Sequence, residues 1–261
     1  MKIPIFQIDA FTQKLFGGNP AAICHLPHWL DDETLLNIAI ENNLAETGYF
    51  VKRDDIYEIR WFMPYAEIDL CGHATLASAY VIFNYIDKTI DEVTFSSKSG
   101  ILKAKKEDNG SITLDFPSRP PKPVDIPKEV FQAFQAKPLK AFVGRDLIIT
   151  VGSEEEVLAE EPKLEFLKGL PYLCTIITTE GKNSDFVSRV FDANPEISLE
   201  DPVTGSAHAA LVPFWAKKLG KTELKAYQLS KRGGEIHCKL DGDRVFLSGY
   251  SVPYLIGEIE I

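Results

Sequence analysis

Two glycines in the chain each begin an Ala-rich segment, and polar side chains stand beside both of them. The first pair is Gly72-His73 and the second is Gly205-Ser206. The first backbone N–H groups of a helix have no partner inside the helix, so a helix start can hold an anion. We therefore expect amides at both glycines to bind a carboxylate or to stabilise developing negative charge. Each glycine could instead serve only a tight strand-to-helix turn.

Glu46 is the acid that is best placed for proton transfer. It lies at the junction of an expected helix, 31–44, and an apolar strand, 47–51. Most glutamates are solvated. Burial at such a junction would suit Glu46 to move a proton, and this interpretation depends on that burial.

His73, Asp201 and Ser206 are the side chains expected to orient a ligand. A helix start disfavours a cation, so we expect a neutral imidazole at His73, either relaying a proton or in a purely structural role. Asp201 precedes the second helix, where an aspartate usually serves as the N-cap, and it could instead hold His73 or a substrate amine. Ser206 would donate to the substrate. The sequence lacks the Gly-x-Ser-x-Gly pattern, so a serine hydrolase is not predicted.

Cys71 directly precedes the first glycine. A thiolate is stabilised at a helix N-terminus, so a nucleophilic or basic cysteine is one interpretation. The matched region of the second half, at Asp201 and Pro202, has no cysteine, which argues against a racemase with two thiols. Cys71 and His73 have no further ligand nearby in the sequence, so no metal site is predicted.

A second pattern is shared by the two halves and indicates an internal duplication. Arg60-Trp61-Phe62 is followed by Glu67-Ile68-Asp69-Leu70, and Arg189-Val190-Phe191 is followed at the same interval by Glu196-Ile197-Ser198-Leu199. The offset is 129 residues, about half the chain. We therefore expect two similar lobes whose helix starts face each other across a cleft.

The expected lobes each contain one buried helix. Apolar residues lie on nearly every side of 73–86, which is typical of a helix that is buried all round. The second such helix is 206–219, and Pro213 should kink or divide it. Four prolines in the seven residues 117–123 indicate a linker. The predicted domains are 1–117 and 124–261, and the last strand is free to return to the first lobe.

The composition excludes several classes of protein. The 261 residues are 45% hydrophobic and carry a net charge of −10, which indicates a globular protein and disfavours nucleic acid and anionic membranes as partners. No apolar stretch reaches the roughly 18–20 residues of a membrane span. The start of the sequence lacks a signal peptide's apolar run, so we expect a cytoplasmic protein with reduced thiols. Nicotinamide, flavin and ATP motifs are missing from the sequence, so no cofactor is expected.

Four segments, in this order along the chain, together resemble the phenazine-biosynthesis isomerase (PhzF-like) family. They are Phe16–Ala22, Ala45–Thr47, Cys71–Thr75 and Asp201–Ala207. The resemblance runs through the whole chain and implies an α+β, diaminopimelate-epimerase-like fold. In that fold two pseudo-symmetric domains each wrap a curled, mostly antiparallel sheet around a central helix, and the active site lies between them. Cofactor-free acid–base isomerisation and a homodimer are also implied.

The same resemblance implies roles for single residues. It matches the family's glutamate acid/base, active-site histidine, aspartate and serine to Glu46, His73, Asp201 and Ser206. It assigns carboxylate-binding amides to Gly72, His73, Gly205 and Ser206, and it matches Asn19 to the family's Gly-Asn-Pro motif. Epimerases of this fold use two cysteines, and Pro202 stands where the second would be.

The sequence thus predicts a cofactor-independent isomerase that moves a proton on a small amino- or hydroxy-carboxylic acid. Two alternatives stay open. One is an amino-acid racemase or epimerase that uses Cys71 as a base, and the other is a small-molecule-binding protein without catalysis.

Overall fold

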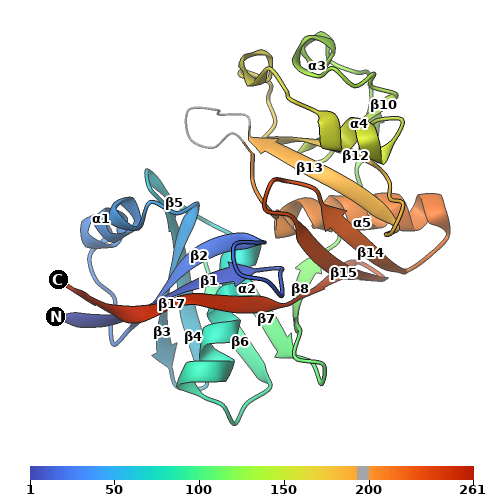
Figure 1. Cartoon of the computed structure of the whole chain (residues 1–261). Coiled ribbons are helices and arrows are strands. Elements are labelled where there is room, and N and C mark those ends of the chain that lie inside the picture. The colour runs from blue at the N-terminus through green and yellow to red at the C-terminus, as the bar shows by residue number, and fades with distance from the viewer. Residues whose placement is uncertain (193–199) are drawn as a thin grey trace. The chain divides into compact units, whose positions relative to one another are not determined.

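The first and last strands of the chain pair with each other, which places both ends of the sequence in one part of the fold. In the computed structural model, residues 1–192 and 200–261 are described. The chain divides into unit 1, Met1–Asp115 with Ser248–Ile261, and unit 2, Phe116–Leu247 (Figure 1). The predicted ranges, 1–117 and 124–261, differ from these units mainly in the last strand, which belongs to unit 1.

Unit 1 is built on strands. Its elements are β1 (Lys2–Ala10), β2 (Asn19–Leu26), α1 (Asp32–Asn42), β3 (Glu46–Arg53), β4 (Ile56–Met63), β5 (Ala66–Ile68), α2 (Gly72–Val81), η1 (Ile82–Ile86), β6 (Glu92–Ser97), β7 (Gly100–Lys106), β8 (Ile112–Pro117) and β17 (Ser251–Glu260). Strand β1 lies between β17 and β2, both antiparallel to it. The pairs β2–β3 and β4–β6 are parallel, while β3–β4, β4–β5, β6–β7 and β7–β8 are antiparallel. The sheet is therefore mostly antiparallel.

Helix α2 is the central helix of unit 1 (Figure 1). Nine of its ten residues are buried, as the all-round apolar pattern predicted. The predicted helix 73–86 ends differently, because its last turn, Ile82–Ile86, is π-helical. Close packing of strand β3 on α2 depends on Gly48, where an added Cβ would lie 3.1 Å from Ile23 Cδ1 and 3.3 Å from Ser78 Oγ. Small side chains at this contact let the sheet close around the helix.

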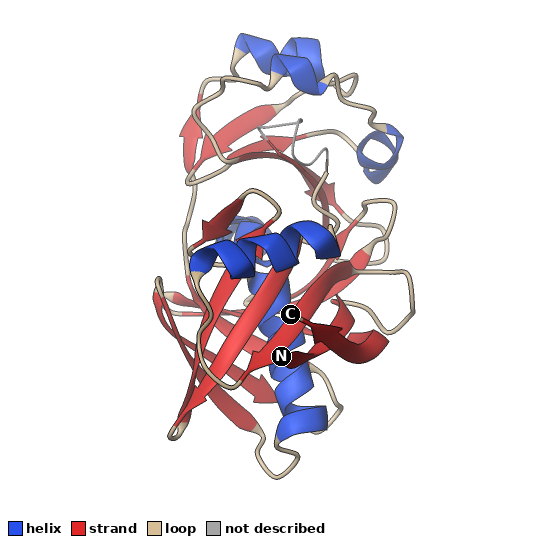
Figure 2. Ribbon diagram, turned by 90° about the vertical axis from the view of Figure 1, so that its left-hand side faces the viewer, coloured by secondary structure: helices blue, strands red, loops and turns tan. Residues whose placement is uncertain are grey.

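Helix α1 covers the opposite side of the same strands. Figure 2 shows it in front of the sheet of unit 1, with α2 behind the strands. Asp31 caps α1 by accepting the backbone N–H of Thr34 at 2.9 Å, which confirms the predicted helix start. The helix ends at Asn42, and its C-cap, Asn43, is left-handed with φ of 48°. Leu35, Ile38 and other buried apolar side chains join α1 to strands β1–β3 in one hydrophobic core.

Unit 2 has its own sheet and core. Its elements are β9 (Lys122–Val124), α3 (Lys128–Ala133), β10 (Lys140–Val143), β11 (Leu147–Thr150), α4 (Glu154–Ala159), η2 (Leu164–Phe166), β12 (Cys174–Glu180), β13 (Phe186–Asp192), α5 (Gly205–Leu219), β14 (Glu223–Gln228), β15 (Gly234–Asp241) and β16 (Arg244–Gly249). Strand β9 overlaps the end of the proline-rich segment that was predicted to be a linker. It pairs with β10, and an edge position tolerates Pro123.

Helix α5 is the central helix of unit 2, and it runs unbroken through Pro213. Pro213 was predicted to kink or divide this helix, and the second of these outcomes, division, is wrong. Proline has no N–H to give to the carbonyl four residues earlier, which belongs to Ala209. That carbonyl instead accepts the backbone N–H of Arg119 at 2.9 Å. A neighbouring segment thus satisfies the group that the proline leaves open, and the helix continues to its left-handed cap at Gly220.

The two units repeat one series of strand pairings. In unit 1 the series β1–β2, β2–β3, β3–β4, β4–β6 and β6–β7 is antiparallel, parallel, antiparallel, parallel and antiparallel. In unit 2 the series β10–β11, β11–β12, β12–β13, β13–β14 and β14–β15 has the same senses in the same order. The central helices α2 and α5 each precede the fourth of these pairings. The duplication inferred from sequence is thus a duplication of topology.

One detail of the predicted repeat is wrong. Arg60 Nε donates to Glu67 at 2.7 Å and its guanidinium lies 5.1 Å from the Phe62 ring centroid. In unit 2, Arg189 Nε donates to Glu200 at 2.7 Å with its guanidinium 5.0 Å from the Phe191 ring. The counterpart of Glu67 is therefore Glu200, and the predicted segment 196–199 lies outside the described residues. The second copy has four additional residues before its helix.

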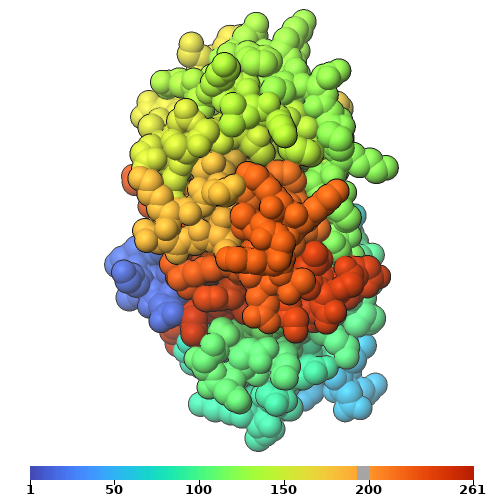
Figure 3. Space-filling model, turned by 90° about the vertical axis from the view of Figure 1, so that its right-hand side faces the viewer, coloured from blue at the N-terminus to red at the C-terminus, as the bar shows by residue number. Residues whose placement is uncertain are grey.

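The surface of unit 2 combines segments that are far apart in sequence. In Figure 3, residues of the middle of the chain, green to yellow, adjoin residues around the end of α5, orange. Over the described ranges, no helix combines the length and hydrophobicity that crossing a membrane requires.

Candidate active site

The two central helices start without a side-chain cap. Cys71 precedes α2 and Thr204 precedes α5, and neither N-cap side chain bonds to the helix. By contrast, Asp31 caps α1 and Ser153 caps α4. A side-chain cap would occupy the first amides of a helix. No N-cap side chain therefore takes the first amides of the two glycine-led helices, and that these amides bind an anion stays a prediction.

Glu46 and His73 meet in the interior of unit 1. Glu46 is the first residue of β3, where it pairs with Ala21 of the parallel strand β2. His73 is the second residue of α2. Glu46 is 9% exposed and His73 is 3% exposed, and His73 Nε2 lies 3.1 Å from Glu46 Oε2. The burial on which the interpretation of Glu46 depended is thus present.

The other ring nitrogen of His73 faces Asn19 and Cys71. Asn19 Nδ2 lies 3.0 Å from His73 Nδ1, and Cys71 Sγ lies 3.5 Å from the same atom. With the Asn19 amide in this orientation, Nδ1 accepts and the neutral ring carries its proton on Nε2. Turning the amide over would present its oxygen to a protonated Nδ1. Asn19 can therefore serve either protonation state of the histidine.

Charge around His73 favours its protonated form. Burial by itself lowers the pKa of His73, but negative charge at Cys71 and Glu46 outweighs this and raises the pKa well above its usual value. Burial also raises the pKa of the Cys71 thiol, with Glu46 adding to the effect, so we attribute the charge mainly to Glu46. The raised pKa runs against the expectation of a neutral imidazole, and the carboxylate at 3.1 Å opposes the effect of the helix dipole.

Glu46, Cys71 and His73 are also of types that bind metal ions. Glu46, Cys71 and His73 offer ligand atoms within 4.8 Å of one another, so Glu46 is a third candidate ligand that sequence reasoning did not find. Their geometry fits an ion poorly, since Cys71 faces Nδ1 of the ring and Glu46 faces Nε2. An ion on either nitrogen would lie away from one of the other two ligands. The arrangement suits proton transfer better.

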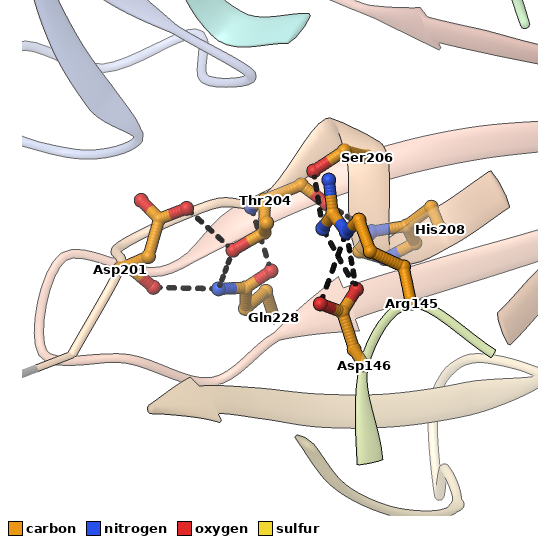
Figure 4. Close-up of polar contacts among 7 residues, drawn as sticks. All are labelled: Arg145, Asp146, Asp201, Thr204, Ser206, His208 and Gln228. Carbon is orange, nitrogen blue, oxygen red and sulfur yellow. Dashed lines mark hydrogen bonds and ion pairs between the residues drawn. The ribbon is translucent and has the colours of Figure 1, made fainter. Parts of the chain in front are cut away.

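Asp201 belongs to a hydrogen-bond network at the start of α5 (Figure 4). Thr204 Oγ1 donates to Asp201 Oδ2 at 2.6 Å, and the Thr204 backbone N–H donates to Gln228 Oε1 at 2.8 Å. Gln228 Nε2 in turn donates to the Asp201 carbonyl at 2.6 Å. Asp201 therefore holds the N-cap residue rather than serving as the N-cap itself. Sequence reasoning missed Gln228, which lies on a strand and carries no motif.

Ser206 contacts a charged pair that the sequence did not reveal. Arg145 Nη2 donates to Ser206 Oγ at 2.9 Å and to Asp146 Oδ2 at 2.7 Å. Asp146 is buried at 2% exposure. Both residues lie in the turn between β10 and β11, about 60 residues before Ser206, so only the fold brings them together.

Equivalent positions in the two units carry different chemistry. Thr47 pairs with Phe62 in unit 1 and Thr175 pairs with Phe191 in unit 2, so Cys174 occupies the position of Glu46. At the helix starts, Thr204 is the counterpart of Cys71, rather than Pro202 as the motif comparison suggested. Burial and nearby carboxylates raise the pKa of the Cys174 thiol. The pairing of a buried carboxylate with a histidine is thus found at this position in unit 1 and is not repeated at its counterpart.

His208 in α5 predicts a pH dependence of stability. It is fully buried, Nδ1 lies 2.8 Å from the Thr204 carbonyl, and burial lowers its pKa from 6.5 to about 4. Between these values the unfolded chain binds a proton that the folded protein does not, so stability falls as pH falls. We expect the free energy of unfolding of wild type, relative to His208→Asn, to drop by about 2 kcal/mol between about pH 7 and pH 5.

Urea unfolding of both proteins at the two pH values measures this difference. His237→Gln removes an exposed histidine and is measured in the same way, as the control for the loss of a histidine elsewhere on the chain. A constant difference between wild type and His208→Asn would contradict the prediction.

The structure groups the predicted site residues into two sets. Glu46, His73, Asn19 and Gly72 lie together in unit 1, with Cys71. Asp201, Gly205 and Ser206 lie in unit 2, where Thr204, Gln228, Arg145 and Asp146 bind them or flank them. The catalytic roles assigned to these residues stay predictions.

Comparison with known proteins gives full-length matches. A family model described as "Phenazine biosynthesis-like protein" matches residues 8–257. An uncharacterised isomerase of Pseudomonas aeruginosa is 42% identical over 261 residues, with all of both chains covered. A crystal structure of a phenazine biosynthesis protein of the PhzF family from Enterococcus faecalis matches with a TM-score of 0.96 and 43% identity, and all of both chains is covered.

More distant structures share the fold alone. A hydroxyproline epimerase from Agrobacterium vitis matches with a TM-score of 0.64 at 10% identity, covering 99% of this chain and 92% of its own. These matches confirm the predicted α+β, epimerase-like fold.

Proposed function

The chain belongs to the phenazine biosynthesis-like family of isomerases, and on that premise we propose that it moves a proton on a small amino- or hydroxy-carboxylic acid without a cofactor. The observation that carries this proposal is the buried contact of 3.1 Å between Glu46 and His73. A carboxylate and an imidazole held together away from water can exchange protons at neutral pH.

Glu46 is the acid/base of the proposed reaction. The C–H bond next to the substrate's acidifying group breaks, its electron pair stays with the substrate, and the proton passes to Glu46. Glu46 then delivers a proton to another carbon on that face, and exchange of its proton with solvent between the two steps lets deuterium from the medium enter the product. Protonated His73 places a positive charge beside the Glu46 carboxylate. Positioned general acid–base catalysis of this kind typically contributes about 10²–10⁴-fold.

Backbone amides complete the proposal. The start of α2 at Gly72 and His73 has no side-chain cap, and the start of α5 at Gly205 and Ser206 has none either. We propose that such amides hold the substrate carboxylate. That Asp201 and Ser206 act on the same substrate as Glu46 stays a prediction. Homodimeric assembly and a cytoplasmic location are likewise parts of the proposal.

The test is proton exchange with solvent. Small amino and hydroxy acids are incubated with the protein in deuterated water, and ¹H NMR follows deuterium uptake at carbon. We expect uptake into one class of acid, together with a shifted double bond or amino-bearing position. No uptake into any acid, or uptake that continues unchanged in Glu46→Gln, would contradict the proposal.

Cys71→Ser separates this isomerase from a racemase that uses the thiol as a base. Because burial raises the pKa of Cys71, the thiol is a poor base, and serine preserves a polar contact with His73. We expect the exchange rate to fall by less than about tenfold, whereas loss of a catalytic base would cost about 10²–10⁴-fold. The rate of deuterium uptake measures the difference.

Cys24→Ser is the matched control, because Cys24 is a fully buried thiol in the same unit and makes no contact with His73. A loss in Cys71→Ser that far exceeds the loss in Cys24→Ser would favour the racemase.

A further inference from the structure

Arg145 lies at the start of α5 although it belongs to the turn between β10 and β11. Its guanidinium donates through Nη2 to Ser206 Oγ at 2.9 Å (Figure 4). Ser206 is half-buried and is the second residue of the helix. The contact therefore joins a fixed positive charge to the one hydroxyl that the sequence singled out.

The chemistry of this contact fixes the direction of the hydroxyl proton. A guanidinium has only donors, while a hydroxyl has one donor and two acceptor positions. Ser206 Oγ must therefore accept from Arg145, and its own proton is left to point toward another acceptor. A hydroxyl that already accepts from a cation is also a stronger donor. Arg145 thus makes Ser206 a hydrogen-bond donor.

Asp146 holds the guanidinium in place. Arg145 Nε donates to both carboxylate oxygens, at 3.0 and 3.1 Å, and Nη2 donates to one of them at 2.7 Å. These bonds use one edge of the guanidinium, and Nη1 has no acceptor among the described residues. In Figure 4 this nitrogen carries no dashed contact. Two fixed donors, Nη1 of Arg145 and the hydroxyl of Ser206, are therefore available side by side.

We propose that Arg145 positions Ser206 as a donor and that the two groups together bind a carboxylate of the ligand. This inference deepens the proposed function, on which it rests for the identity of the ligand as an acid. A carboxylate has two acceptor oxygens and matches a pair of adjacent donors. The uncapped start of α5 supplies further N–H groups beside them.

The expected selectivity comes from directed donors rather than from net charge. Asp146 neutralises Arg145, and Asp201 lies within electrostatic range of the guanidinium. An amide of the same shape as a carboxylate can accept from one side only, so it should bind more weakly. Acetate and acetamide are such a pair of probes.

The test compares these probes on the full chain by ¹H–¹⁵N NMR, read at the amides of Gly205 and Ser206. We expect wild type to prefer acetate to acetamide by roughly tenfold, the scale of a charge-assisted hydrogen bond. Arg145→Gln alone would leave the buried Asp146 carboxylate without its cation. The variant is therefore the double substitution Arg145→Gln with Asp146→Asn. This variant should lose the preference while a structural role would weaken both probes equally.

Ser206→Ala should lose most of the same preference, and combining it with the double substitution should cost little more, because the groups act as one unit. Arg53→Gln removes a charge from an exposed pair in unit 1 and should change nothing. The proposal would be overturned if wild type did not bind acetate saturably, or if the double variant still preferred acetate to acetamide. Glu46→Gln should keep the preference, so failure here is distinct from failure of the exchange chemistry.

Discussion

Glu46→Gln is expected to lower the exchange rate by about 10²–10⁴-fold while the protein stays folded and still binds a carboxylate ligand. Glutamine has nearly the shape of glutamate and keeps a polar group beside His73 Nε2, which lies 3.1 Å from the present carboxylate. What it cannot do is take a proton from carbon. The loss should therefore appear in kcat rather than in KM.

Deuterium uptake into the acid identified by the solvent-exchange screen gives the rate, and thermal unfolding shows that the fold is kept. Glu41→Gln removes a carboxylate from the exposed side of α1 and is the matched control. A rate in Glu46→Gln close to that of Glu41→Gln would remove Glu46 from the mechanism. A large rise in KM with unchanged kcat would reassign Glu46 to binding.

Gly18→Ala is expected to destabilise the protein by about 3 kcal/mol, from the combined cost of a left-handed backbone and of overpacking. Gly18 has φ of +62° in the turn between β1 and β2. An added Cβ would overlap the carbonyl oxygen of Ala10 and lie 2.9 Å from Thr12 Cγ2. Backbone has to shift to admit it, and the next residue is Asn19, which contacts His73.

Gly242→Ala is the control that separates the cost of the left-handed backbone from the cost of overpacking. Gly242 has nearly the same φ, +58°, but an added Cβ there meets no atom within 4 Å. Gly242→Ala should therefore lose only the left-handed penalty, about 1–2 kcal/mol. Unfolding by denaturant measures both variants. Equal losses would show that the Ala10 carbonyl adapts freely and that Gly18 does not fix the position of Asn19.

The sequence pattern predicts best those helices and strands that are equally buried along their whole length. Helices α2 and α5 were predicted because apolar residues on every side indicate burial in any fold. Strand β2 was missed, since Gly17-Gly18-Asn19-Pro20 indicates a turn. Its pairing with β1 and β3 overrides that local preference, and pairing partners are not visible in one segment.

The candidate site divides in the same way. Glu46 and His73 were found because each stands at a predicted junction of elements, and their burial was then the only open condition. Arg145 and Asp146 follow a lone glycine in a short turn, without any spacing that indicates chemistry. Their importance arises from a contact with Ser206 that spans 61 residues. The predicted repeat matched Glu67 to Glu196 because it assumed equal spacing in both halves. The second half has four additional residues before α5, and only the contacts of Arg60 with Glu67 and of Arg189 with Glu200 reveal them.

The pairing of β1 with β17 bears on the order in which the molecule can be completed. Nine residues of the first strand, Lys2–Ala10, find partners in Ser251–Glu260, which a ribosome makes only after all of unit 2. Until then one edge of β1 has open backbone groups, and such an edge invites pairing with other chains. Unit 2 can fold from contiguous sequence during synthesis, whereas unit 1 must wait for a segment that follows unit 2 in the sequence. Nascent chains of this protein should therefore depend most on chaperones after unit 2 has formed and before β17 has left the ribosome.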